Sequence, residues 1–141
     1  MNVKDIMNKE VFSVSKNTTV QEAAKIMTEK NIGSITITDS KTKILYGIIT
    51  DRDIITRCIG KNLDPYKTSV GDIMTKNTIC VNPRNSVTES ARIMAKNKIR
   101  RLPVCEHGKI VGIISLGDIS RSKLMFAETA SAFCDICEDH H

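Results

Sequence analysis

The feature that most constrains the fold of this chain is an internal duplication. Three blocks of the sequence return in the same order: residues 3–7 as 70–74, residues 19–27 as 86–94, and residues 47–54 as 112–119. The first two pairs are offset by 67 positions and the third by 65, so one loop is two residues longer in the first copy. A repeat of this kind predicts two copies of one structural unit.

The first helix of each copy is marked both at its start and along one face. Glu22 follows Thr19 by three residues, which is the spacing of a capping box, and Glu89 follows Ser86 in the same way. Apolar residues then recur three or four positions apart: Val20, Ala23, Ala24 and Met27 in the first copy, and Val87, Ala91 and Met94 in the second. This period predicts an amphipathic helix with one face in the core.

Short β-rich runs lie on both sides of this helix. Residues 11–14 and 78–81 predict a strand before it, and residues 34–38 alternate polar and apolar side chains, which is typical of a half-buried strand. A further strand, at residues 44–49 or 110–114, leads into a second helix. In the first copy we expect that helix to have one apolar face, formed by Ile54, Ile55, Cys58 and Ile59.

This order of elements predicts an α/β (α+β) fold in which two β-α-β-β-α repeats pack as a pseudo-twofold pair. The predicted divisions are residues 3–62 for the first repeat, 63–69 for a linker, 70–126 for the second repeat and 127–141 for a C-terminal tail. A copy of about 60 residues buries little apolar surface by itself, so we expect the two copies to form one domain.

Composition excludes several classes of function. No apolar run approaches the roughly 20 residues of a membrane span, and residues 1–6 lack the apolar stretch of a secretory signal. We therefore expect a cytoplasmic protein without a membrane partner. A net charge of +5 favours anionic partners, but three Phe, two Tyr and no Trp offer little for stacking on nucleic acid. Nucleic-acid binding is thus the least favoured alternative.

Enzymatic activity is not expected. The sequence contains no Walker loop, no glycine-rich dinucleotide fingerprint and no local signature of a Ser/His/Asp or Cys/His set. His107 is the one histidine outside the tail, so acid–base catalysis would depend on carboxylates or lysines, and nothing marks a pair of them.

The duplicated blocks resemble a tandem pair of CBS domains, also called a Bateman module. The resemblance covers about residues 3–126. It is carried by Asp-Ile-Met near the start of each copy, by Arg-Leu-Pro-Val at residues 101–104, and by the paired turns Gly-Ile-Ile-Thr-x-x-Asp at residues 47–53 and Gly-Ile-Ile-Ser-x-x-Asp at residues 112–118. All of these marks are quite specific when they recur in register.

The resemblance implies a regulatory binding module and not an enzyme. CBS pairs commonly bind AMP, ADP, ATP, S-adenosylmethionine or NAD-type ligands in a cleft between the repeats, associate as homodimers and signal to an effector protein, which this sequence does not identify. In the family the Asp of the turn holds the ribose, while the Thr or Ser and basic residues hold phosphate. Carried over, the implied ligand-binding residues are Thr50, Arg52, Asp53, Arg100, Arg101, Ser115 and Asp118.

The same two turns allow a simpler interpretation. Thr50 with Asp53, and Ser115 with Asp118, have approximately the spacing of a capping box. Helix capping alone would therefore explain each pair, without a ligand. The two turns also differ in charge, and Arg100 and Arg101 occur only in the second copy. We therefore expect two chemically unequal sites.

The cysteines divide into two groups. Cys58, Cys80 and Cys105 lie in apolar surroundings and are expected to behave as small hydrophobic residues. The tail carries Cys134, Cys137, His140 and His141, a set that can ligate tetrahedral zinc, although its spacing is shorter than in zinc fingers. A zinc-binding or redox-linked interaction tail, and a frayed end open to oxidation, are both compatible with this pattern.

Overall fold

The computed structural model describes residues 1–76, 78–122 and 134. The chain divides into two compact units. One unit, here called the first-repeat unit, consists of Val11–Thr78 and Gly108–Ile110. The other, the second-repeat unit, consists of Met1–Glu10, Ile79–His107 and the residues from Val111 onward.

These units are not the two sequence repeats, because the opening segment of each copy packs with the other copy. In the second-repeat unit the Val3 N–H donates to the Asn85 carbonyl at 2.9 Å. In the first-repeat unit the Val70 N–H donates to the Thr18 carbonyl at 2.8 Å. Each unit is therefore completed by a segment that precedes the other repeat in the sequence.

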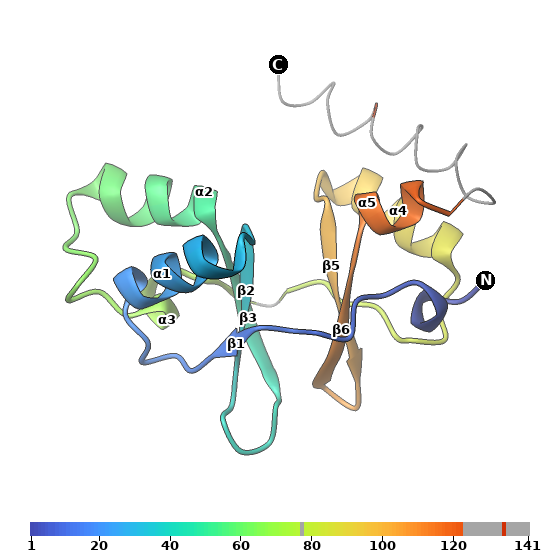
Figure 1. Cartoon of the computed structure of the whole chain (residues 1–141), viewed down its shortest axis with the longest axis horizontal. Coiled ribbons are helices and arrows are strands. Elements are labelled where there is room, and N and C mark those ends of the chain that lie inside the picture. The colour runs from blue at the N-terminus through green and yellow to red at the C-terminus, as the bar shows by residue number, and fades with distance from the viewer. Residues whose placement is uncertain (77, 123–133, 135–141) are drawn as a thin grey trace. The chain divides into compact units, whose positions relative to one another are not determined.

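The first-repeat unit is a four-stranded sheet with helices. Its elements are β1 (Ser13–Val14), α1 (Val20–Lys30), β2 (Ser34–Thr38), β3 (Leu45–Thr50), α2 (Asp51–Asp53), η2 (Ile54–Cys58), η3 (Ile59–Lys61), α3 (Val70–Ile73) and β4 (Thr75–Lys76). The strand order is β1-β2-β3-β4, with β1 parallel to β2 and the other pairs antiparallel. Figure 1 shows α1 and α2 on the same side of this sheet.

The second-repeat unit repeats this arrangement with a smaller sheet. Its elements are η1 (Val3–Asp5), α4 (Val87–Asn97), β5 (Arg101–Glu106), β6 (Lys109–Ser115), which belongs to this unit from Val111 onward, and α5 (Leu116–Ser120). Strands β5 and β6 form a two-stranded sheet, and Val81 pairs with Val104 of β5 through an isolated parallel bridge. The predicted mixed α/β class is confirmed.

Helices α1 and α4 form where their sequences predict them. The Thr19 Oγ1 accepts the Glu22 N–H at 3.1 Å, and the Ser86 Oγ accepts the Glu89 N–H at 3.0 Å. The predicted apolar faces enter the cores, with these residues buried: Val20, Ala23 and Met27 on α1, and Val87, Ala91 and Met94 on α4. None of the helices among the described residues is long and apolar enough to cross a membrane.

The expected burial of one strand and of one helix is wrong. Strand β2 is buried at all five positions and is not half-buried. Its polar Thr36 is accommodated because the side chain bonds to the Ser13 Oγ at 2.6 Å and to the Phe12 carbonyl at 3.3 Å. In the second helix, Ile55 and Ile59 are 63% and 51% exposed and do not join the buried face. The π-helical turn η2 leaves a narrower buried face, formed by Ile54 and Cys58.

A glycine in each unit allows the opening segment to lie against a strand. A Cβ on Gly47 of β3 would be 2.5 Å from the Thr75 carbonyl oxygen, and a Cβ on Gly112 of β6 would be 2.6 Å from the Met7 Sδ. Real Cβ atoms essentially never approach that closely. Glycine is therefore required at position 47, where the close atom is a backbone oxygen, whereas at position 112 a Cβ would displace the Met7 side chain and lie 3.1 Å from the Asn8 carbonyl oxygen.

The three cysteines of the repeats lie in different environments. Cys58 and Cys105 are buried, as expected, but Cys80 is exposed, so the expectation for Cys80 is wrong. Burial, together with the charge of the neighbouring Cys80 thiolate and a hydrogen bond to Cys80, raises the pKa of Cys105 from 9.0 to about 12. The folded chain thus keeps the Cys105 proton at a pH where the unfolded chain loses it.

A matched pair of substitutions tests the exchange of opening segments. Val3 and Val70 are both fully buried, Val3 in the core of the second-repeat unit and Val70 in that of the first-repeat unit. Removing two methyl groups from either core costs roughly 1–3 kcal/mol. In native-state hydrogen exchange, Val3→Ala should raise amide exchange mainly in residues 79–122, and Val70→Ala mainly in residues 11–76. If Val3→Ala raised amide exchange in residues 11–76 alone, the opening segment would not pack in the second-repeat unit.

The raised pKa of Cys105 predicts that stability falls with increasing pH. Below pH 9 both states are protonated, and above it the unfolded state gains thiolate, so the free energy of unfolding decreases until about pH 12. Between pH 8 and 10.5 the Cys105 thiol should contribute a loss on the order of 1–2 kcal/mol. Urea unfolding under reducing conditions gives the free energy of unfolding at each pH. The loss is measured as the difference between the wild type and Cys105→Ala in the slope of this free energy against pH. Equal slopes in the wild type and in Cys105→Ala would exclude this role for Cys105.

Candidate functional site

The turn that ends β3 starts a helix through a reciprocal pair of hydrogen bonds. The Asp53 N–H donates to the Thr50 Oγ1 at 3.1 Å, and the Thr50 N–H donates to the Asp53 Oδ2 at 2.9 Å. These two bonds form a complete capping box. The capping interpretation of the sequence is confirmed for this turn.

The turn that ends β6 has the same geometry. The Asp118 N–H donates to the Ser115 Oγ at 3.1 Å, and the Ser115 N–H donates to the Asp118 Oδ2 at 2.9 Å. Each cap stabilises its unit by about 1 kcal/mol. Because capping occupies Oδ2 of each aspartate, the other carboxylate oxygen, Oδ1, is the one that faces other partners.

The two turns differ in the backbone donors that they leave available. In the first turn the Asp51 N–H donates to the Gly33 carbonyl at 3.0 Å, and the Arg52 N–H donates to the Asp51 Oδ1 at 2.8 Å. A phosphate there would have to replace one of these bonds and would meet the Asp51 carboxylate.

The second turn has no carboxylate at the position of Asp51, where Leu116 stands. The Leu116 N–H donates to the Arg100 carbonyl at 2.9 Å. The next N–H, of Gly117, donates to no acceptor within the part of the chain that the structure describes. The second turn is therefore less anionic than the first and leaves one backbone N–H available for a ligand.

Each aspartate also contacts an arginine that the sequence analysis did not single out. The Arg57 Nε lies 3.6 Å from the Asp53 Oδ1, and the Arg121 Nη2 lies 2.5 Å from the Asp118 Oδ1. These arginines follow their aspartates by four and three positions, the spacing that brings side chains together on one helix face. That spacing is the sequence signal that could have identified them.

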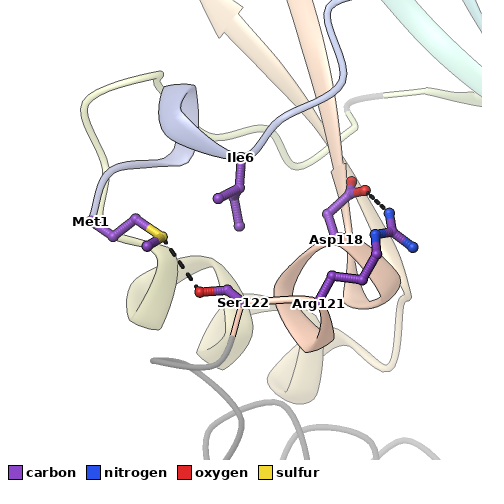
Figure 2. A pocket seen from close by; sticks show the side chains of 5 residues that line it. All are labelled: Met1, Ile6, Asp118, Arg121 and Ser122. Atoms are coloured by element: carbon purple, nitrogen blue, oxygen red, sulfur yellow. Dashed lines mark hydrogen bonds and ion pairs between the residues drawn. The ribbon is translucent and has the colours of Figure 1, made fainter.

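A pocket of about 390 Å³ lies beside Asp118 in the second-repeat unit. Its lining residues are Met1, Ile6, Asp118, Arg121 and Ser122. Figure 2 shows the Asp118–Arg121 pair on one side of it and Met1 with Ser122 on the other, joined by a bond of 3.6 Å from the Ser122 Oγ to the Met1 Sδ. The pocket thus combines one carboxylate, one guanidinium and two apolar side chains.

The seven predicted ligand-binding residues fall into two groups. Thr50, Arg52 and Asp53 belong to the first-repeat unit, and Arg100, Arg101, Ser115 and Asp118 to the second-repeat unit. Of the seven, only Asp118 lines the pocket. The side chains of Arg100 and Arg101 are exposed, and neither guanidinium has a hydrogen bond or ion pair with a described residue.

The predicted metal ligands of the tail lie mostly outside the described residues. Cys137, His140 and His141 are not among them, and Cys134 is an exposed free cysteine. Within residues 1–76, 78–122 and 134, no group of three or more His, Cys, Asp or Glu side chains could hold a metal ion.

Comparison with known proteins agrees with the duplicated architecture. The family model of the CBS domain matches residues 3–60 and 70–124. The chain is 36% identical over 134 residues to the CBS domain-containing protein YhcV of Bacillus subtilis. The alignment covers 95% of this chain and 94% of YhcV.

Two solved structures are similar in both fold and sequence. The crystal structure of hypoxic response protein I with two coordinated zinc ions has a TM-score of 0.79 and 32% identity, covering 86% of this chain and 98% of that one. The CBS domain pair of protein MJ0100, in complex with 5′-methylthioadenosine and S-adenosyl-L-methionine, has a TM-score of 0.76 and 35% identity, covering 86% and 94%. With its two turns and two family matches, the chain belongs to the CBS domain family as a tandem pair of CBS domains.

Proposed function

We propose that this chain is a non-catalytic regulatory module that binds an adenine nucleotide or an adenosyl compound. The observation that carries the proposal is the pocket beside Asp118, in which a carboxylate, a guanidinium and apolar side chains converge. Its volume of about 390 Å³ lies within the range of small-ligand sites. The related CBS pair of MJ0100 was solved with two adenosyl ligands, which supports this class of ligand.

Asp118 supplies the chemistry for a ribose. Its Oδ2 is fixed by the Ser115 N–H, which orients the carboxylate, while among the described residues its Oδ1 pairs with the exposed guanidinium of Arg121. A carboxylate in this position can accept hydrogen bonds from the 2′- and 3′-hydroxyl groups of a ribose, as an acidic residue does in dinucleotide-binding folds. In this proposal the ribose replaces Arg121 at Oδ1.

The basic and apolar residues supply the remaining contacts. Arg121, once released, can pair with a phosphate or carboxylate of the ligand, since a guanidinium fork matches either group. Arg100 and Arg101 are further candidates, because their guanidinium groups are exposed and have no bond with a described residue. Met1 and Ile6 offer an apolar surface for the base.

The regulatory effect would come through the opening segment. Met1 and Ile6 belong to Met1–Glu10, which is held in the second-repeat unit by backbone bonds such as that from Val3 to Asn85. A ligand that contacts both this segment and Asp118 stabilises the packed arrangement over any looser one, and it shifts the equilibrium by its difference in affinity. We propose that a second copy of the chain and an effector protein detect this shift.

A thermal-shift experiment with AMP, ATP, NAD, S-adenosylmethionine and 5′-methylthioadenosine tests the proposal. At a hundredfold excess over its dissociation constant, the bound compound should stabilise the chain by about 2.7 kcal/mol. Asp118→Asn keeps an oxygen for the cap but replaces the other by an amide, so binding should weaken at least tenfold, or by about 1.4 kcal/mol.

The matched control is Asp51→Asn, which changes an exposed aspartate of the other turn. It should bind like the wild type. Absence of a shift with every compound would refute the proposed function, and unchanged binding by Asp118→Asn would show that the pocket is the wrong site.

Zinc binding by the tail is the second candidate function. It is supported by the zinc ions in the structure of the related hypoxic response protein I and by the exposed thiol of Cys134. In this proposal Cys134, Cys137, His140 and His141 provide four ligands for one ion.

Zinc analysis of the purified chain tests this second function. We expect about one zinc per chain after dialysis, reduced to background by Cys134→Ser with Cys137→Ser. Cys80→Ser is the matched control, because Cys80 is also an exposed thiol but lies outside the tail. Zinc content that is unaffected by loss of both tail cysteines would exclude the tail as the site.

A further inference from the structure

The repeat offsets place an arginine and a serine at equivalent positions beside the two aspartates. At the offset of 65 that relates Asp53 to Asp118, Arg57 corresponds to Ser122 and Thr56 to Arg121. At the offset of 67 that relates the opening segments, Ile73 corresponds to Ile6. The second-repeat pocket, lined by Ile6, Asp118 and Ser122, therefore has its counterpart between Ile73, Asp53 and Arg57.

Arg57 occupies that counterpart with its own side chain. Its Nη1 donates to the Ile73 carbonyl at 3.0 Å and to the Thr75 Oγ1 at 3.0 Å. Its Nε lies 3.6 Å from the Asp53 Oδ1. The guanidinium thus spans the distance from the aspartate of the turn to the segment that contains Ile73.

The second repeat leaves the same position open. Ser122, which replaces Arg57, is too short to span from Asp118 to Ile6, and both of these residues line the pocket (Figure 2). Arg121 is one residue closer to its aspartate, and its side chain is 74% exposed against 43% for Arg57. Asp118 is its one side-chain partner among the described residues.

We propose that Arg57 acts as an internal substitute for a ligand in the first repeat, so that the chain binds one nucleotide, at Asp118. The proposal rests on the nucleotide-binding function put forward above and goes beyond it by assigning the vacant and the filled site. A ribose that approaches Asp53 meets an Oδ1 already paired with a guanidinium that two further acceptors hold in place. A ribose that approaches Asp118 displaces only an exposed arginine with a single partner.

Isothermal titration with AMP and with S-adenosylmethionine tests this assignment on variants in which Arg57 or Ser122 is replaced by the residue of the other repeat. The wild type should bind one molecule per chain. Arg57→Ser, which copies the second repeat, should bind two, and adding Asp53→Asn to it should return the stoichiometry to one. Ser122→Arg, which copies the first repeat, should weaken binding at least tenfold.

The controls separate this inference from the proposed function. Arg92→Ser removes an exposed arginine of α4 and should bind like the wild type. Two molecules on the wild type, one on Arg57→Ser, or full binding by Ser122→Arg would overturn the role of Arg57 while nucleotide binding stands. Absence of binding by the wild type and by Arg57→Ser alike would refute the proposed function and this inference together.

Loss of the Arg57 bonds can also weaken the fold, so each variant is first compared with the wild type by circular dichroism and thermal unfolding. Ser122→Arg keeps the test decisive if Arg57→Ser does not fold, because Ser122 makes only a weak bond to the Met1 sulfur. Binding weakened at least tenfold by Ser122→Arg then supports the proposal, and unchanged binding overturns it.

Discussion

The structure depends on the close packing of each opening segment against the last strand of the other repeat. Backbone bonds from Val3 to Asn85 and from Val70 to Thr18 anchor the opening segments, and the glycines at positions 47 and 112 leave room for them beside the strands. It completes the core of each unit, since Val3 and Val70 are fully buried. It also brings Met1 and Ile6 beside Asp118, so the pocket exists only because the segments are exchanged.

Capping and the proposed ligand binding involve the same type of aspartate and do not conflict. One carboxylate oxygen starts the helix, which fixes the orientation of the side chain, and the other remains for a partner. In the first repeat that partner is Arg57, bonded in turn to Ile73 and Thr75. In the second it is the exposed Arg121. A small difference in sequence, one arginine moved by one position, thus gives the two aspartates different surroundings.

Local patterns predicted the parts of the fold that local interactions determine. The capped starts of α1 and α4, their buried faces and both turn caps follow from spacings of three and four residues. The full burial of β2 and the exchange of opening segments depend on contacts between residues far apart in the sequence, which periodicity does not reveal. The unequal sites were expected from charge, but Arg57 and Arg121 were overlooked although they lie on the same helix face as the aspartates.

The most direct test of unequal turns is to follow their backbone amides by NMR during titration with AMP or S-adenosylmethionine. We expect the amide signals of Gly117 and Asp118 to shift in proportion to one bound molecule per chain, while those of Arg52 and Asp53 stay in place. Equal shifts in both turns, or shifts confined to Arg52 and Asp53, would contradict it.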